Sequence, residues 1–336
     1  MLVTLALTAC SSGAVGEPTP TEIVSAPSPT PTPTPTREPQ VPFDGDCTSV
    51  LSAAQLDSLF PGGWRTEAES RDAQGLPSYP DIRATSVGTL GGIECEWHNA
   101  AASSDGSEAY SLAIVVLPQD QVPTAFVEDF AIARCDPSYD AQGCRVARSA
   151  GEYWVMSRTY GSQEASSSLL EAAADAAVST IGDSFDGVPA DDRDGWFTPL
   201  ECEDLAEEIS IGDVIGAGYV NGYWEGSTQP EEILLSEGGV GFTCPWYSVD
   251  GSAPGGRSYI IQATVASGGA WDWDRIATRE TATPVPVEGA VAAVTYPVNG
   301  DSVWLYATDG INVVELTNGD VGGLGELAGR MLALNG

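Results

Sequence analysis

The only histidine of the 336-residue chain lies in the stretch CEWHN, residues 95–99, three positions after a cysteine and beside a tryptophan. An imidazole titrates near neutral pH, so a single histidine is a natural candidate for a general acid, general base or metal ligand. If the stretch forms a strand, alternation places Cys95 and Trp97 on one face and His98 on the other. A second Cys-x-Trp stretch further along the chain carries Tyr247 at the corresponding position. We therefore interpret His98 as a strand residue on the less buried face and expect no catalytic residue in it.

Two Gly-Asp-Ser stretches, at residues 182–184 and 300–302, resemble the serine block of lipase-like hydrolases. A serine nucleophile needs a base to take its proton, usually a histidine later in the chain. No histidine follows His98 in the sequence, and the first stretch comes after a predicted helix rather than a strand. We interpret both stretches as turns.

Two other motifs lack what a cofactor or metal site needs. GLGELA, residues 323–328, follows a predicted strand and opens a helix, as a dinucleotide fingerprint does, but only eight residues remain after it. ADDRDG, residues 190–195, approaches a calcium loop but has Ala190 where an acid is required. The cysteines contain no C-x-x-C pair for a zinc site. We expect no cofactor and no bound metal.

The stretch AWDWDR, residues 270–275, places two tryptophans and two aspartates near a predicted helix start. Tryptophan faces beside carboxylates suit sugar rings, so Trp271, Asp272, Trp273 and Asp274 are the candidate ligand-binding residues. On a helix the two tryptophans diverge by about 200°, so at most one can enter a core. The alternative interpretation is that one tryptophan is a core residue and the other packs on the neighbouring domain.

Acidic residues dominate the charge of the chain. There are 48 Asp and Glu residues against 13 basic ones, all of them arginine, and the formal net charge is −35. A surface this negative repels phosphate backbones and anionic lipid headgroups, so we expect no nucleic-acid partner. Apolar residues make up 42% of the chain and nine residues are tryptophan, which suffices for real cores, and the length suggests two domains.

The first ten residues, MLVTLALTAC, form a short apolar run that ends in Leu7, Thr8, Ala9 and Cys10. This ending resembles a bacterial lipobox, which implies that residues 1–9 are a signal and that Cys10 becomes the acylated first residue of the mature protein. Acyl chains anchor a protein to the bilayer, since each buried methylene contributes roughly 0.8 kcal/mol. No basic residue precedes the apolar run, so we expect the natural start to lie further upstream.

The segment that follows the anchor, within residues 10–42, alternates proline with small polar residues and contains PSPTPTPTPTREP. Such a segment favours the polyproline II conformation, which rises about 3.1 Å per residue, so it would extend up to roughly 90 Å from the anchor. We interpret it as a stalk. With Cys10 set aside, six cysteines remain, the even number expected in an oxidising compartment.

An internal repeat is visible in the spacing of cysteines and tryptophans. Each half has an early cysteine at a predicted helix start and a later Cys-x-Trp strand. The offsets between matched residues are 155 for Cys47 and Cys202, 149 for Cys95 and Cys244, and 150 for Trp154 and Trp304. A shift of about 150 residues indicates a tandem duplication. Matching positions imply matching disulfides, so we predict Cys47–Cys95 and Cys202–Cys244, which leaves Cys135 to pair with Cys144.

Hydrophobic patterns predict the same α+β domain twice, in residues 43–184 and 198–336, joined by a polar linker at 185–197. We expect each copy to be an antiparallel sheet with helices packed on one face and a disulfide that staples it. In the first copy the pattern predicts helices over 48–60, 122–134 and 166–182, and strands over 93–99, 109–118 and in a hairpin over 145–160. In the second it predicts strands over 258–267, 289–297, 302–308 and 311–317, and helices over 270–278 and 325–334.

A lipobox cysteine, a Pro/Thr stalk and a domain that runs from D-C-x-x-x-L to a C-x-W strand together resemble the cell-envelope lipoproteins of actinobacteria that carry a domain of unknown function. The domain is more remotely similar to the extracellular sensor domains of mycobacterial Ser/Thr kinases. The second copy departs from the pattern, since it reads E-C-E-D-L. The resemblance implies a location and a fold, and transfers no catalytic residue.

We therefore expect a non-catalytic, monomeric lipoprotein, anchored by Cys10 to the bilayer at the outer face of the cytoplasmic membrane, with a binding or accessory role. Its partner would be a cell-wall glycan or another envelope protein. One alternative is an envelope glycan hydrolase that works with two carboxylates, which needs only Asp or Glu. Another is a sensor or partner-binding module for another envelope protein.

Overall fold

The computed structural model describes residues 38–75, 78–100, 110–138, 141–161, 167–216, 218–222, 229–248, 260–299 and 302–334. These belong to one compact unit, Thr36–Gly336. The predicted signal, the lipidation site Cys10 and most of the predicted stalk lie outside the described residues. Among the residues that are described, no helix combines the length and the apolar character that crossing a lipid bilayer requires.

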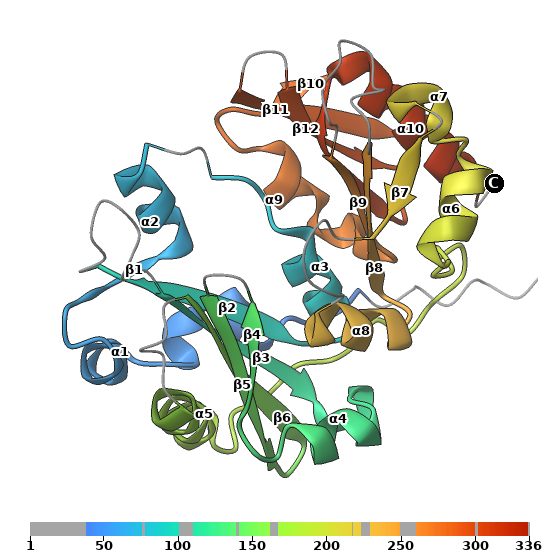
Figure 1. The fold of residues 1–336 in the computed structure, drawn as a ribbon. Coiled ribbons are helices and arrows are strands. Elements are labelled where there is room, and N and C mark those ends of the chain that lie inside the picture. The colour runs from blue at the N-terminus through green and yellow to red at the C-terminus, as the bar shows by residue number, and fades with distance from the viewer. Residues whose placement is uncertain are drawn as a thin grey trace, which may run out of the picture. The chain divides into compact units, whose positions relative to one another are not determined.

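The first copy is an antiparallel sheet in the order β1-β2-β3-β6-β5-β4 (Figure 1). Its strands are β1 (Trp64–Thr66), β2 (Ile93–Asn99), β3 (Tyr110–Pro118), β4 (Arg134–Ser138), β5 (Ala141–Ala150) and β6 (Tyr153–Gly161). Its helices are α1 (Ala53–Leu59), α2 (Glu67–Ala73), α3 (Ile82–Thr89), α4 (Thr124–Asp129) and α5 (Ser167–Ile181), with short 3-10 turns η1 (Pro42–Gly45), η2 (Cys47–Ser49) and η3 (Gln119–Gln121).

The second copy has an antiparallel sheet in the order β10-β11-β12-β13-β9-β8-β7. Its strands are β7 (Tyr219–Asn221), β8 (Gly241–Ser248), β9 (Ile260–Ala266), β10 (Thr283–Pro284), β11 (Ala292–Asn299), β12 (Ser302–Thr308) and β13 (Val313–Gly319). Its helices are α6 (Cys202–Glu208), α7 (Gly212–Ile215), α8 (Pro230–Glu237), α9 (Trp273–Ala277) and α10 (Val321–Ala333), with the 3-10 turn η4 (Gly269–Asp272).

The two sheets repeat one strand order, since β1-β2-β3-β6-β5-β4 corresponds to β7-β8-β9-β13-β12-β11, with β10 added at the edge. The predicted α+β class and the two antiparallel sheets are confirmed. The proposed match of Trp154 with Trp304 is wrong, because Trp154 lies on β6 and Trp304 on β12, which is the counterpart of β5. The constant offset failed there because the loops between the strands differ in length.

The three predicted disulfides, Cys47–Cys95, Cys135–Cys144 and Cys202–Cys244, are all formed. Cys47 opens η2 and Cys202 opens α6, and each is tied to the Cys-x-Trp strand of its copy, β2 or β8. Disulfides of this number fit an oxidising, extracytoplasmic compartment. The disulfides Cys47–Cys95 and Cys202–Cys244 therefore fix β2 and β8 against the first helical segment of each copy.

Helix starts follow from local capping. The helix predicted over 48–60 is divided into η2 and α1 because Ser52 begins a new helix, in a capping box with Gln55. Thr66 and Glu69 form the same kind of box at the start of α2, and Asp320 accepts hydrogen bonds from the first amides of α10.

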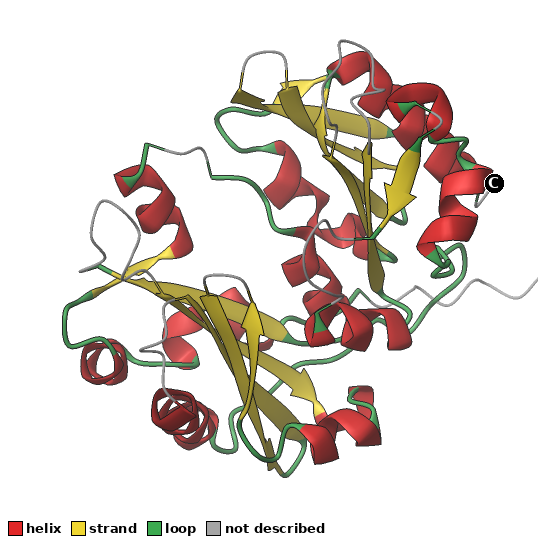
Figure 2. Ribbon diagram, viewed as in Figure 1, coloured by secondary structure: helices red, strands yellow, loops and turns green. Residues whose placement is uncertain are grey.

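Each sheet has one core of its own. In the first copy, α1 and α5 bring Leu56, Ala173 and Ala177 onto the face of the sheet that carries Cys95 and Trp97. In the second copy, α6 and α10 cover the equivalent face, with Leu205, Leu324, Leu327 and Met331 against Cys244 and Trp246. Figure 2 shows these helices beside the two sheets.

The opposite faces of the two sheets are covered by an exchange of equivalent helices. α3 and α8 each come just before the Cys-x-Trp strand of their own copy. Ile82 of α3 packs with Tyr296, Tyr306 and Val313 of the second sheet. In return, α8 packs on the first sheet, where its Leu234 and Leu235 join a cluster with Trp154 and Met156. Both helices also contact their own sheet, α3 through Val87 and α8 along β8, and in Figure 1 both lie between the two sheets.

Candidate functional site at the junction of the two copies

The structure divides the four predicted ligand-binding residues between different surroundings. Trp271 lies at the junction, where its Nε1 donates a hydrogen bond to Thr89 Oγ1 of α3 at 3.0 Å. Asp272 is buried and accepts a hydrogen bond from Thr85 Oγ1 at 2.7 Å. Trp273 packs against the cluster around Tyr296, and Asp274 is exposed. One tryptophan thus meets a core and the other packs on the neighbouring copy, the arrangement that the alternative interpretation describes.

Two hollows flank Trp271. The larger has a volume of about 610 Å³ and is walled by both copies and by the segment that leaves the predicted stalk. Its lining is Pro39, Gln40, Val41, Asp44, Gly45, Ala84, Ile93, Glu94, Trp271, Asp272 and Arg275. The smaller has a volume of about 400 Å³ and lies against the linker, with Asp192, Asp194 and Trp196 among its lining residues. Trp271 therefore forms a wall of both.

The stalk-side wall of the larger hollow is held in place by backbone pairing. Gln40 and Val188 of the linker exchange two backbone hydrogen bonds, of 2.8 Å and 3.0 Å. The backbone amide of Phe43 donates to Asp186 Oδ1 at 3.1 Å. The wall therefore keeps its position where the chain enters the folded unit.

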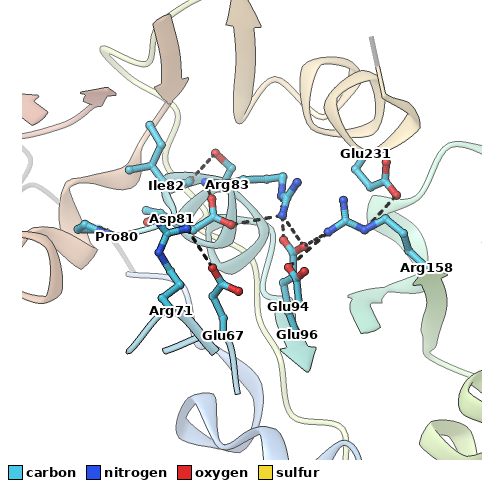
Figure 3. Close-up of polar contacts among 12 residues, drawn as sticks. Glu67, Arg71, Pro80, Asp81, Ile82, Arg83, Glu94, Glu96, Arg158 and Glu231 are labelled. Atoms are coloured by element: carbon cyan, nitrogen blue, oxygen red, sulfur yellow. Dashed lines mark hydrogen bonds and ion pairs between the residues drawn. The ribbon is translucent and has the colours of Figure 1, made fainter. Parts of the chain in front are cut away.

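A chain of ion pairs, most of which Figure 3 shows, includes Glu94, which lines this hollow. Arg83 of α3 makes two contacts with Glu94 of β2, at 3.1 Å from Nε and 2.9 Å from Nη2. Arg158 of β6 contacts Glu94 at 3.1 Å and Glu231 of α8 at 3.7 Å. Arg145 of β5 then holds Glu231 with two hydrogen bonds, of 2.7 Å and 3.1 Å. Both copies contribute to this network, since Glu231 belongs to the second.

The two acids of the network differ in their electrostatics. Burial raises the pKa of Glu94 above its ordinary value, although Arg83 and Arg158 oppose the shift. Burial also acts on Glu231, but there Arg158 and Arg145 outweigh it and hold the pKa below its ordinary value. The two guanidinium groups therefore favour the ionised form of Glu231.

The second sheet carries a buried acid in a different setting. Burial, together with the negative charge of Asp81, raises the pKa of Glu315 on β13 to about 8. Its neighbour Tyr306 on β12 donates a hydrogen bond to the Pro80 carbonyl at 2.9 Å. Glu315 therefore titrates in the physiological range, where it faces the start of α3.

His98 lies where the alternation of the strand predicts. Cys95 and Trp97 are buried in the core of the first sheet, whereas the His98 side chain is 25% exposed. Its Nε2 contacts a carboxylate oxygen of Glu67 on α2 and lies 3.6 Å from Glu96 Oε1. Burial alone would lower the pKa of His98, but the contact with Glu67 and the charge of Glu96 raise it above its ordinary value.

Glu67, Glu96 and His98 could hold a metal ion, because each offers one ligand atom and these atoms lie within 4.8 Å of one another. The sequence reasoning did not find this cluster. Glu96 and His98 are two positions apart on one face of a strand, which was a usable signal. Glu67 is far from them in sequence, and only the pairing of β1 with β2 brings it close.

The remaining motifs lie in separate parts of the fold. Gly182-Asp183-Ser184 directly follows α5 in a turn, and GLGELA lies within α10. ADDRDG lies in the linker, and Gly300 and Asp301 of the second Gly-Asp-Ser stretch lie outside the described residues.

Comparisons with protein-family models, with curated proteins and with solved structures found no match for this chain.

Proposed function

We propose that the chain is a non-catalytic lipoprotein of the outer face of the cytoplasmic membrane, anchored through Cys10, and that it binds a cell-wall glycan fragment at the junction of its two copies. The hollow of about 610 Å³ beside Trp271 carries this proposal. Its volume lies in the range of small-molecule binding sites, and such sites often lie between domains. The lipobox-like ending at Cys10, the proline-rich segment and the three disulfides support the location.

The lining suits a polyhydroxylated ligand. Trp271 offers an aromatic surface, and the exposed carboxylate of Asp44 can accept hydrogen bonds from hydroxyl groups. Glu94 and Asp272 also line the hollow, but their side chains are buried and already bonded to arginines. Arg275 adds donors to the same hollow. This combination of one aromatic ring with several fixed polar groups favours a sugar, and a muropeptide is the cell-wall fragment chosen as the probe.

The carboxylates of the hollow are engaged in a way that favours binding over hydrolysis. Asp272 is held by Thr85 and by Arg275, and Glu94 by Arg83 and Arg158. A glycosidase needs one acid free to give up a proton and a second free to attack or to activate water. One observation supports the hydrolase alternative, namely the raised pKa of Glu94, which lines the hollow.

The test uses the full chain with Cys10→Ala, which cannot be acylated, and titration calorimetry against purified muropeptides. We expect saturable binding that Trp271→Ala weakens at least tenfold, while Trp271→Phe keeps part of the affinity because a ring remains. The matched control is Trp64→Ala, since Trp64 is also partly buried but bonds to Asp57, away from the hollow. Equal affinities of the Trp271→Ala and Trp64→Ala variants, or no binding by the parent chain, would overturn the proposal.

The same samples separate binding from hydrolysis. Product analysis after incubation with wall glycan should show no cleavage by the parent chain. Cleavage that Glu94→Gln abolishes would establish the hydrolase instead. Capture of an envelope protein, with no affinity for muropeptides, would establish the partner-binding module.

A further inference from the structure

We propose that Glu67, Glu96 and His98 form a binding site for one divalent transition-metal ion, Zn²⁺ being the best fit. The site is separate from the hollow beside Trp271, so it goes beyond the proposed function, and neither proposal needs the other. From the sequence we expect no bound metal, and this proposal departs from that expectation.

The three side chains are placed by rigid parts of the first copy. Glu96 and His98 project from the same face of β2, whose neighbouring residue Cys95 is fixed by the disulfide to Cys47. Glu67 is the first residue of α2, directly after the capping residue Thr66. A site on a stapled strand and a capped helix start needs little rearrangement to receive an ion.

The ligand atoms already face one another. His98 Nε2 contacts one carboxylate oxygen of Glu67, Oε2, and lies 3.6 Å from Glu96 Oε1. Nε2 has almost no exposed surface, so it is enclosed by these two carboxylates. Ligand atoms about 2.0–2.2 Å from a zinc ion lie roughly 3–4 Å from one another. A small outward shift of Glu67 therefore makes room for the ion.

The outer oxygens of both carboxylates are held by arginines. Glu67 Oε1 pairs with Arg71 Nη1 at 3.4 Å, and Glu96 Oε2 lies 3.8 Å from Arg158 Nη2. Each carboxylate thus turns one oxygen toward an arginine and the other toward His98. Hydrogen-bonded partners behind the ligands orient them in protein metal sites, and Arg71 is such a partner for Glu67, while Arg158 acts on Glu96 through a longer electrostatic contact. This arrangement distinguishes the cluster from acids that merely lie close on a very acidic surface.

The chemistry of the three ligands selects the ion. One imidazole nitrogen with two carboxylate oxygens suits Zn²⁺ and its first-row neighbours, whereas Mg²⁺ and Ca²⁺ prefer oxygen ligands alone. The side chains of Glu67, Glu96 and His98 are 44%, 27% and 25% exposed, so water can complete the coordination.

The experiment uses the full chain with Cys10→Ala, without a histidine tag, stripped of metal. The substitution also removes the one cysteine outside the three disulfides. Zn²⁺ is titrated by calorimetry with millimolar Mg²⁺ present to occupy loose acidic sites. We expect one Zn²⁺ per chain, with His98→Gln and Glu96→Gln each weakening the affinity at least tenfold. The matched control is Glu203→Gln on exposed acidic α6, which should leave the affinity unchanged.

Because His98 is the only histidine of the sequence, the parent chain offers a second readout that needs no variant. A ¹⁵N spectrum of the imidazole should show a large shift of the Nε2 resonance when one equivalent of Zn²⁺ is added. An unchanged imidazole spectrum, or equal Zn²⁺ affinity of the parent and His98→Gln chains, would show that the cluster is only an ion-pair network. Binding of muropeptides by the same samples is scored independently.

Discussion

The two copies share a scaffold but differ in what their junction faces bury. The first sheet places its acid Glu94 among arginines, with Arg83 and Arg158 in direct contact. The second sheet buries Glu315 near Tyr306 and opposite Asp81, and the pKa of Glu315 rises to about 8. The Cys-x-Trp strands differ too, since the first carries Glu96 and His98 where the second has Pro245 and Tyr247. The copies thus share the disulfide and the strand order, but each buries an acid in a different electrostatic setting.

The largest effect is expected when the ion pair between Arg145 and Glu231 across the junction is removed. Glu231→Gln leaves Arg145, whose side chain is 5% exposed, without its carboxylate. We expect the free energy of unfolding to fall by about 3–5 kcal/mol, because an uncompensated buried charge remains. Urea denaturation measures the loss. The double variant R145M/E231L should recover most of it, and a loss as large in the double variant as in the single one would contradict the account.

The pH dependence of stability sharpens the contrast between the two buried acids. Glu315 has a raised pKa, so the folded state holds its proton up to about pH 8, whereas the unfolded chain releases it near its ordinary value. Its contribution to stability is therefore fully present below pH 4.5 and is lost as the pH rises to about 8. The loss is about 1.4 kcal/mol for each unit by which the pKa is raised.

The variant Glu315→Gln removes this titration. Relative to the parent chain, it should gain stability as the pH rises from 5 to 9, by a few kcal/mol at the upper end. Thermal or urea unfolding at several pH values gives the comparison. Parallel stability profiles of the two chains would mean that Glu315 titrates normally.

The smallest effect on the free energy of unfolding is expected from a substitution in α3. Thr85 of α3 donates a hydrogen bond to Asp272, which also keeps Arg275 as a partner. Thr85→Val should therefore lower the free energy of unfolding by only about 1 kcal/mol. A loss equal to that of Glu231→Gln, measured in the same urea series, would show that the polar contacts of α3 and α8 contribute equally to stability.

Much of the scaffold could be predicted from the sequence because it follows local rules. The repeat of early cysteine and Cys-x-Trp strand indicated all three disulfides, and alternation along β2 placed Trp97 inside and His98 outside. The junction could not be predicted in this way. The contact of Arg145 with Glu231 joins residues 86 positions apart in different copies, and nothing in either local pattern encodes it.

The candidate site illustrates the same limit on a smaller scale. Trp271 was selected from its neighbours in the sequence, but its role as a wall between two hollows depends on Thr89 and Pro39, which come from other segments. The cluster around His98 depends on Glu67, which the short strand β1 delivers to the edge of the sheet. Tertiary pairing decides which side chains meet once the local elements have formed.

The helix exchange also sets the order in which the chain can become fully folded. The strands of the first sheet have all emerged once the chain reaches Gly161, yet Trp154 and Met156 receive Leu234 and Leu235 only after α8 has followed. Until then an apolar surface faces water, and such surfaces promote aggregation during biogenesis. A chain interrupted between the copies would leave Trp154 and Met156 with only the cover of the first copy, from Val87, Phe126 and Phe130. Complete burial of this face therefore requires the chain as far as Glu237.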